Sequence, residues 1–151
     1  MSEVKQYIIV RTDVTEKTGE PVSSGTLSLF VARASVSFLS NLVKFNSHRK
    51  VFCTAAERER SWVVSFIVDN VVKDWVDSDS DMVLLKASSL HTLDSIVEEA
   101  KAAGLVEGTD YFCVYDTCSL VRPDESSDRS FVAVGFRPMD AGLLKWVEKR
   151  V

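Results

Sequence analysis

Apolar residues along this chain fall into two kinds of segment: short continuous runs, and longer stretches with a spacing of three or four residues. Continuous runs at residues 6–14, 82–87, 111–115 and 131–136 predict strands, and the first is apolar enough to be covered on both faces. Periodic stretches at residues 23–45 and 61–76, between residues 89 and 104, and from residue 140 onward predict helices. This mixture of helices and strands is typical of an α/β protein.

The order of these segments predicts how the strands are arranged. A helical connection follows each of the first two strands, which favours parallel neighbours, whereas the polar segment between the last two strands favours a hairpin. We therefore expect a four-stranded mixed sheet in which only the last strand is antiparallel to its neighbours, with helices on both faces. We see no internal repeat and no linker, so we expect residues 1–151 to form a single domain.

The predicted helix at residues 23–45 carries two rows of side chains. Ser23 or Ser24 is suited to cap its first turn. An apolar row is expected to pack on the core, and it consists of Leu27, Val31, Ala34, Phe38, Leu42 and Phe45. A mixed row lies beside it, and it consists of Thr26, Phe30, Arg33 and Ser37. We expect this second row to face something other than the core.

The stretch at residues 61–76 has an unusually broad apolar stripe. Its members are Val63, Val64, Ile67, Val68, Val71, Val72, Trp75 and Val76. The helical period and the length of the stretch outweigh the strand preference of valine, so we predict one amphipathic helix over residues 61–76. Together with the preceding link it forms an enlarged helical segment at residues 46–76. A broad apolar face often marks an interface, and we expect this helix to bind a partner or a second copy.

Composition favours an intracellular globular protein. The 151 residues are 46% hydrophobic, and the net charge of −4 gives no general attraction to nucleic acid, although a local basic patch is compatible with it. Three cysteines form no paired framework. The longest apolar-rich stretch, residues 62–75, is interrupted by polar residues and is too short to span a bilayer. We expect a cytoplasmic protein that does not enter a membrane.

Residues 77–81 carry alternating aspartates in the manner of a calcium-binding loop. Such a loop requires glycine at its sixth position and glutamate at its twelfth, where this chain has Met82 and Ser88. A solvated acidic turn is the simpler interpretation. The chain also has no glycine-rich phosphate loop and no pair of metal ligands at a known spacing, so the sequence implies no metal site and no cofactor.

Two segments of this chain resemble the peptidyl-tRNA hydrolase 2 family. The first is the strand YIIVRTD (residues 7–13) with the helix start GTLSLFVARA (residues 25–34), where the family has a strand ending in Arg-Thr-Asp and a helix reading roughly Gly-Lys-x-Ala-Ala-Gln-x-x-His-Ala. The second is DMVLLKASSLHTLDSIVEEAKAAGL (residues 81–105), which is similar to the family's strand–helix segment. The resemblance implies the family's mixed-sheet fold, and tRNA or peptidyl-tRNA as a binding partner.

The residues that carry the family's chemistry differ here. Thr26 stands where the family has its lysine, Phe30 where it has glutamine, and Arg33 where it has histidine. The resemblance matches Asp116 to an aspartate that faces the lysine, and Ser130 to a threonine. Sites in open α/β sheets also lie beyond the carboxyl ends of parallel strands. The predicted site therefore has Asp116 as its catalytic candidate and, as binding candidates, Thr12, Asp13, Thr26, Phe30, Arg33, Thr117 and Ser130.

Two hypotheses for function follow. In the first, the hydrolytic site has degenerated and the domain is a binding or regulatory module. Ester hydrolysis needs a base or positioned water and a donor for the oxyanion, whereas Thr26 supplies a hydroxyl without charge and Phe30 supplies no polar group. In the second, the protein cleaves the ester between peptide and tRNA with Asp116 in the site. Asp116 is itself open to two interpretations, since aspartate is also common as a turn or capping residue.

Overall fold

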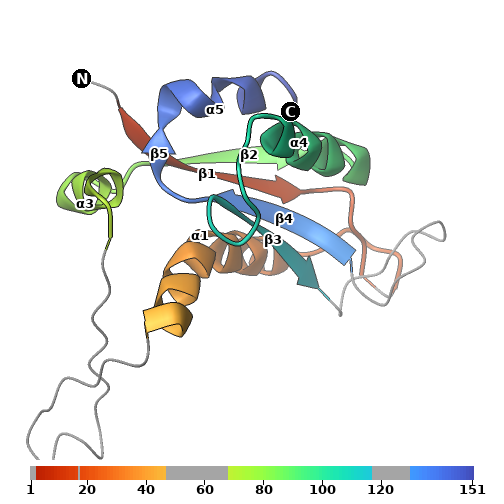
Figure 1. The fold of residues 1–151 in the computed structure, drawn as a ribbon. Coiled ribbons are helices and arrows are strands. Elements are labelled where there is room, and N and C mark those ends of the chain that lie inside the picture. The colour runs from red at the N-terminus through yellow and green to blue at the C-terminus, as the bar shows by residue number, and fades with distance from the viewer. Residues whose placement is uncertain (1–2, 17, 47–67, 117–129) are drawn as a thin grey trace, which may run out of the picture.

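The computed structural model describes residues 3–16, 18–46, 68–116 and 130–151. Its sheet has the strand order β2-β1-β4-β3, formed by β1 (Val4–Arg11), β2 (Met82–Ala87), β3 (Tyr111–Asp116) and β4 (Ser130–Phe136). β1 and β2 run parallel, whereas β4 is antiparallel to both β1 and β3 (Figure 1). The predicted mixed sheet, in which β4 is antiparallel to both of its neighbours, is confirmed.

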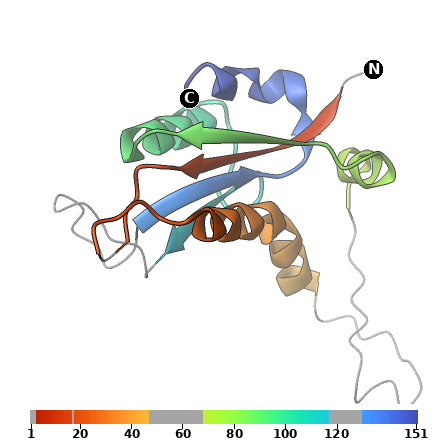
Figure 2. The same ribbon diagram turned by 180° about the vertical axis from the view of Figure 1, so that it is seen from behind.

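Helices lie on both sides of this sheet, as expected. They are α1 (Ser24–Asn46), α3 (Asn70–Asp77), α4 (Leu90–Ala102) and α5 (Ala141–Glu148). Figures 1 and 2 show α4 and α5 on one face and α1 on the other. α3 packs against the second half of α1, where the Phe38 and Trp75 rings meet edge to face with centroids 6.0 Å apart.

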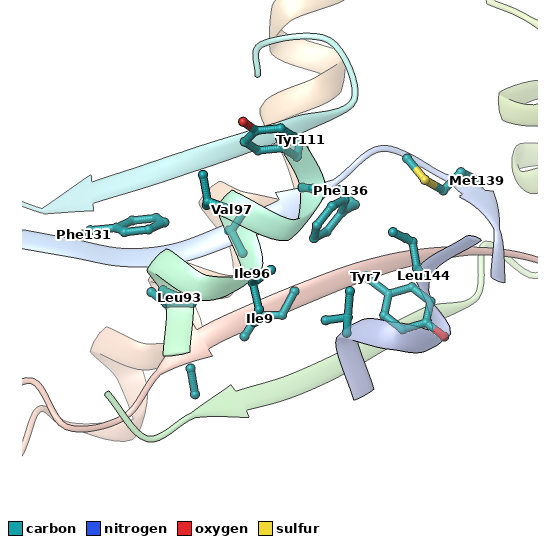
Figure 3. Packing of buried hydrophobic residues seen from close by; sticks show 14 of the residues in the cluster. Tyr7, Ile9, Leu93, Ile96, Val97, Tyr111, Phe131, Phe136, Met139 and Leu144 are labelled. Carbon is teal, nitrogen blue, oxygen red and sulfur yellow. The ribbon is translucent and has the colours of Figure 1, made fainter. Parts of the chain in front are cut away.

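Each face of the sheet has its own apolar core. Tyr7 and Ile9 pack under α4 and α5 with Ile96 and Leu144 (Figure 3), whereas Ile8 and Val10 pack under α1. Successive side chains of a strand point to opposite faces. The continuous apolar run at the start of the chain is therefore explained by a strand buried on both sides.

α1 crosses the sheet very closely at Gly135 of β4. A Cβ atom at this position would lie 2.4 Å from the carbonyl oxygen of Ala34 in α1. No side chain fits into that space, so the absence of one at residue 135 sets the depth at which α1 packs. This contact fixes α1 relative to β4.

The boundaries of the first strand differ from the prediction of residues 6–14. β1 starts at Val4 because Val4 and Lys5 pair with the two-residue strand β5 (Met139–Asp140), which the sequence did not predict. β1 ends at Arg11, since beyond it the chain turns into a loop closed by an isolated bridge between Thr15 and Pro21. Thr12 and Asp13 therefore follow the strand, where the strand-end rule places a site.

The single helix predicted over residues 61–76 is wrong in extent. Val68 and Asp69 lie outside any helix, and α3 begins at Asn70 because the Asp69 side chain caps it by accepting a hydrogen bond from the Val72 N–H at 2.9 Å. Residues 61–67 lie outside the described residues. Within α3, Val72 and Trp75 are buried against α1, and Val71 and Val76 are exposed. In the described part of the chain, no helix is both long and apolar enough to cross a membrane.

Candidate functional site

Strand register brings several predicted site residues to one end of the sheet. Asp116 is paired with Ser130 across the β3–β4 ladder. Val10 of β1 is paired with Ala133 of β4 in antiparallel register, so the carboxyl end of β1, which Asp13 follows, lies at the same end of the sheet as Ser130 at the start of β4. Asp13 after β1, Ser130 at the start of β4 and Asp116 at the end of β3 therefore lie at the same end of the sheet. The strand-end rule predicted this place for Asp13 and Asp116, and the family resemblance added Ser130.

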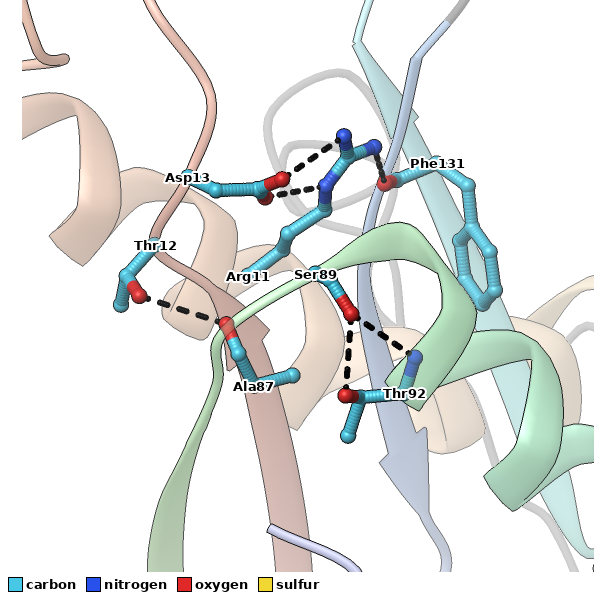
Figure 4. Close-up of polar contacts among 7 residues, drawn as sticks. All are labelled: Arg11, Thr12, Asp13, Ala87, Ser89, Thr92 and Phe131. Carbon is cyan, nitrogen blue, oxygen red and sulfur yellow. Dashed lines mark hydrogen bonds and ion pairs between the residues drawn. The ribbon is translucent and has the colours of Figure 1, made fainter.

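Arg11 is the most unusual residue at this end of the sheet. Its side chain is only 1% exposed, and its Nε and Nη2 atoms donate to the two Asp13 carboxylate oxygens at 2.5 and 3.3 Å (Figure 4). Its Nη1 also donates to the Phe131 carbonyl oxygen at 3.3 Å. A buried guanidinium is tolerated when its charge is paired and its donors are used. The pair fixes the Asp13 carboxylate and joins β1 to β4.

Sequence reasoning did not single out Arg11, although a signal was present. Arg11 directly follows an apolar run and stands two residues before Asp13. Residues two apart on an extended chain point the same way, so a cation and a carboxylate at this spacing beside a buried strand predict an internal ion pair.

Thr12 has a structural contact at the same strand end. Its backbone N–H and its hydroxyl both donate to the Ala87 carbonyl oxygen, at 3.0 and 3.3 Å (Figure 4). The next turn of chain carries Ser89, whose Oγ accepts from the Thr92 N–H at 3.2 Å and caps α4. Thr12 thus ties the end of β1 to the end of β2.

The start of α1 is held by a serine cap. The backbone N–H of Thr26 donates to the Ser23 Oγ at 3.1 Å, and the two hydroxyl oxygens are also 3.1 Å apart. Ser23 is therefore the capping residue, one of the two serines that the sequence left open. The Thr26 hydroxyl lies within this cap, at the position where the family has a lysine.

Phe30 does not belong to an exposed row. Its side chain is fully buried and packs with Ile8, Val10 and Val132 in the core under α1. The expectation that Phe30 faces a binding site is wrong, because Phe30, Ala34 and Phe38 are spaced four apart on one line of α1, and this line faces the core. Ala34, from the predicted apolar row, is buried beside it, whereas Leu27 and Val31 are only partly buried.

Arg33 lies on the outer side of α1 and reaches the edge strand. Its Nη2 donates to the Tyr115 carbonyl oxygen at 2.9 Å, one residue before Asp116. Further along α1, the Asn41 Nδ2 donates to the Gly108 carbonyl oxygen at 2.6 Å. α1 therefore runs antiparallel to β3, and its N-terminal end points toward the Asp116 end of that strand.

A polar groove of about 520 Å³ separates α1 from β3. Arg33, Ser37 and Asn41 line one side, and Cys113 and Tyr115 line the other. Arg33 and Ser37 were expected on one face, and the structure places both along this groove. Tyr115 and Cys113 were missed because an isolated strand gives no sign of which edge will be free.

The Cys113 thiol in this groove is not a nucleophile. Burial, with a smaller effect from Glu107, raises its pKa to about 12. The thiol is therefore protonated at neutral pH, and only a thiolate attacks efficiently. Burial also raises the pKa of Tyr115, whose ring stacks on Phe131 with centroids 5.3 Å apart.

Among the predicted site residues that the structure describes, Ser130 has a buried polar atom that makes no hydrogen bond. Its side chain is fully buried, and its Oγ has no hydrogen-bond partner among the described residues. A buried hydroxyl without a partner is uncommon and costly, so such an atom is suited to a water or a ligand. Asp116 lies directly opposite it on β3, and Thr117 lies outside the described residues.

Comparison with known proteins agrees with this geometry. The model of the family described as Peptidyl-tRNA hydrolase PTH2 matches residues 4–147. The chain belongs to the PTH2 family. No curated protein matches it at a significant level. The match confirms the resemblance and the α/β fold, and it identifies a peptidyl-tRNA hydrolase-like protein whose family acts on peptidyl-tRNA.

Within this PTH2 protein, the predicted site divides into three groups. Asp13, Ser130 and Asp116 gather at one end of the sheet. Arg33 lies near them, because it donates a hydrogen bond to the carbonyl oxygen of Tyr115, the residue before Asp116. Thr12 and Thr26 lie nearby but take part in strand and helix-cap contacts. Phe30 belongs to the core.

Proposed function

We propose that this PTH2 protein binds tRNA or peptidyl-tRNA without hydrolysing it and acts as a binding or regulatory module. The observation that carries the proposal is the burial of Phe30, at the position where the family has glutamine. A fully buried phenylalanine offers no polar group to a substrate. The neighbouring Thr26 provides a hydroxyl within the Ser23 cap in place of the lysine charge.

The chemistry of ester hydrolysis supports the same proposal. A developing oxyanion needs a preorganised donor, and losing one such donor typically lowers the rate by about 10²–10³. Arg33 is a poor substitute, since it stands two helical turns from Thr26 and its guanidinium already donates to the Tyr115 carbonyl. Arginine also stays protonated in proteins, so it does not act as a base.

An active hydrolase is the second candidate, and Ser130 favours it. Its buried Oγ lacks a partner among the described residues and lies opposite Asp116 in the ladder. A hydroxyl donor and a carboxylate at one strand end are the elements of oxyanion stabilisation and water activation. If the enzyme is active, Asp116→Asn and Ser130→Ala each abolish or strongly reduce cleavage.

We place the proposed binding surface along the groove between α1 and β3. Arg33 is exposed there, and the net charge of −4 makes a local cation more important for contact with phosphate. Arg33→Gln should weaken tRNA binding and reduce its salt dependence. The matched control is Arg150→Gln, which removes a surface arginine paired with Glu99 on the α4–α5 face.

Self-association through residues 61–76 stays a proposal. In the described part of this stretch, Val71 and Val76 are its exposed apolar side chains. Val71→Asp tests whether they contribute to an interface. A single PTH2 domain over residues 1–151, and the cytoplasmic location expected from composition, also stay proposals.

Two assays on one preparation test the proposed function. Peptidyl-tRNA cleavage is measured beside an active family member, and tRNA binding is measured by fluorescence anisotropy. We expect binding that Arg33→Gln weakens, with no cleavage above background. Cleavage by the natural sequence supports the second candidate, and absence of both binding and cleavage contradicts both.

A further inference from the structure

The strand β3 leaves part of its edge open inside the groove beside α1. β3 stands at one end of the strand order, and β4 is the strand that pairs with it in the described part of the chain (Figure 2). The groove follows this edge, with Ser37, Ser40 and Asn41 of α1 on one side and Cys113 and Tyr115 on the other. An open strand edge within a groove is a place where an extended peptide adds as a further strand.

An existing hydrogen bond shows which backbone groups of β3 point into the groove. The Tyr111 carbonyl oxygen accepts from the Gly108 N–H at 2.8 Å, so this carbonyl group is directed away from β4. Backbone groups alternate along a strand, and the register of the β3–β4 ladder shifts only after Val114. The N–H and C=O groups of Cys113 therefore also point away from β4, where an added strand can pair with them.

Two side chains of α1 mark the ends of this open stretch. Arg33 donates to the Tyr115 carbonyl oxygen at 2.9 Å, and Asn41 donates to the Gly108 carbonyl oxygen at 2.6 Å. Arg33 and Asn41 stand eight residues apart on α1, which corresponds to about 12 Å along the helix axis. An extended chain rises about 3.3 Å per residue, so about four residues of peptide fit between these two contacts.

The two ends of the groove carry opposite charges. Among the described residues that line it, Arg33 is the cation and Glu107 is the anion, and both are exposed. Arg33 lies at the Tyr115 end, where Asp116 and Ser130 are paired across the ladder. Phosphate groups are attracted to Arg33, whereas a positively charged amino group fits beside Glu107.

We infer that this groove binds the peptide of a peptidyl-tRNA as an added strand parallel to β3, an inference that rests on the proposed binding of tRNA. A peptidyl-tRNA has the carboxyl end of its peptide joined to the tRNA. Phosphate contact with Arg33 therefore brings the carboxyl end of the peptide to the same place, and the amino end runs toward Glu107. The ester carbonyl then lies at the end of the sheet where Asp116 and Ser130 are paired.

Strand addition at this edge recognises a peptide through its backbone. In a parallel pair, the Cys113 N–H donates to one peptide carbonyl group, and the Cys113 C=O accepts from a peptide N–H two residues further on. Peptide side chains alternate between the two faces, and those on the α1 side meet the small residues Ser37 and Ser40. The groove therefore accepts peptides of varied sequence, and tRNA without a peptide gains nothing from it.

The first test compares two ligands of the full chain by fluorescence anisotropy. One is tRNA without a peptide, and the other carries tetra-alanine joined by an amide in place of the ester, so that it stays intact whether or not the protein cleaves esters. Two added backbone hydrogen bonds should tighten binding of the peptidyl form by about tenfold or more. Equal binding of both ligands overturns this inference and leaves tRNA binding intact. Absence of binding to both removes the proposed function, and this inference with it.

Filling the groove should abolish the preference. Ser37→Trp places a large side chain between α1 and β3 and leaves Arg33 unchanged. The matched control is Ser28→Trp, because Ser28 and Ser37 both donate to the carbonyl oxygen four residues earlier in α1, and Ser28 lies on the side that faces β2. Ser40→Trp, at an exposed position in the same groove, replaces Ser37→Trp if a melting curve shows that variant to be unfolded. A preference that persists in a folded groove variant places the peptide elsewhere.

A proline scan of the tetra-alanine tests strand addition itself. Proline has no N–H, and only alternate residues of an added strand direct this group toward β3. We therefore expect a single proline to lower the affinity of the peptidyl-tRNA at alternate positions only. Equal losses at neighbouring positions, or no loss at any position, contradict the ladder with Cys113.

The direction of the peptide is tested at its amino end. Acetylation of the tetra-alanine amino group removes its positive charge, so it should weaken binding several-fold in the natural protein and have no effect in Glu107→Gln. An effect of acetylation that is the same in both proteins contradicts the parallel direction.

Discussion

Replacing Gly135 by alanine should be the most destabilising conservative change on β4. The added Cβ would lie 2.4 Å from the Ala34 carbonyl oxygen and 2.9 Å from its carbonyl carbon. Both are backbone atoms, so no side-chain rotation relieves the overlap. α1 has to recede by more than half an ångström to reach an ordinary contact.

The size of the effect follows from packing. A radial gap of about 0.5–1 Å already forfeits a quarter to a half of each dispersion contact, and the core under α1 includes Phe30 and Ala34. Overpacking of this kind costs about 1–3 kcal/mol, and the rigid neighbour places Gly135→Ala in the upper part of that range. For a chain of this length, a loss of about 2–3 kcal/mol lowers the melting temperature by about 4–12 °C.

Urea denaturation followed by circular dichroism measures this loss. The matched control is Gly25→Ala, where the nearest atom to the added Cβ is the Ser23 Oγ at 3.7 Å. We expect Gly25→Ala to change the free energy of unfolding little. If Gly135→Ala is as stable as the natural sequence, α1 does not pack on β4 at the depth described. Ala34→Gly should not rescue Gly135→Ala, because the overlap involves the carbonyl group.

Three further changes have defined outcomes. Phe30→Gln restores the family residue but removes a buried ring, so denaturant titration should show a loss of about 3 kcal/mol or more, and a neutral change means that Phe30 is outside the core. Asp69→Ala removes the cap of α3 and the ion pair with Arg137, and the melting curve should show a cost of about 1–2 kcal/mol, with Asp79→Ala as the neutral control. Burial and a hydrogen bond to Glu148 raise the pKa of Tyr7 from 10.0 to about 12. Burial also raises the pKa of Cys113, from 9.0 to about 12. The unfolded chain therefore ionises first, and the free energy of unfolding should hold below pH 9 and fall as the pH rises toward 12, less steeply in Tyr7→Phe.

Much of the fold is encoded in local patterns. The strand at residues 82–87 was predicted to the residue, because apolar positions on both faces are bounded by an acidic turn and two serines. The cap at Ser89 and the cap at Asp140 follow from single side chains beside a periodic stretch. β5 escaped prediction, since two residues carry no period and pair only when β1 lies beside them.

The errors have separate physical causes. Two apolar rows of α1 competed for the core, and packing on the sheet buries the row with Phe30, Ala34 and Phe38 and leaves Leu27 and Val31 partly exposed. The helix predicted over residues 61–76 was extended through Asp69, whose side chain proved to be a cap. Arg11 was passed over although its spacing from Asp13 already indicated an ion pair on one side of an extended chain.

Single-turnover cleavage of peptidyl-tRNA, with enzyme in excess, tests the central claim most directly. We expect no hydrolysis above background for the natural sequence, no change for Asp116→Asn, and rapid cleavage by an active family member in parallel. Thr26→Lys with Arg33→His, keeping Phe30 because glutamine at that position would be buried in the core, is the variant with any chance of activity, provided that its melting curve shows a folded protein. Cleavage by the natural sequence that disappears in Asp116→Asn would contradict the account and make this protein a hydrolase.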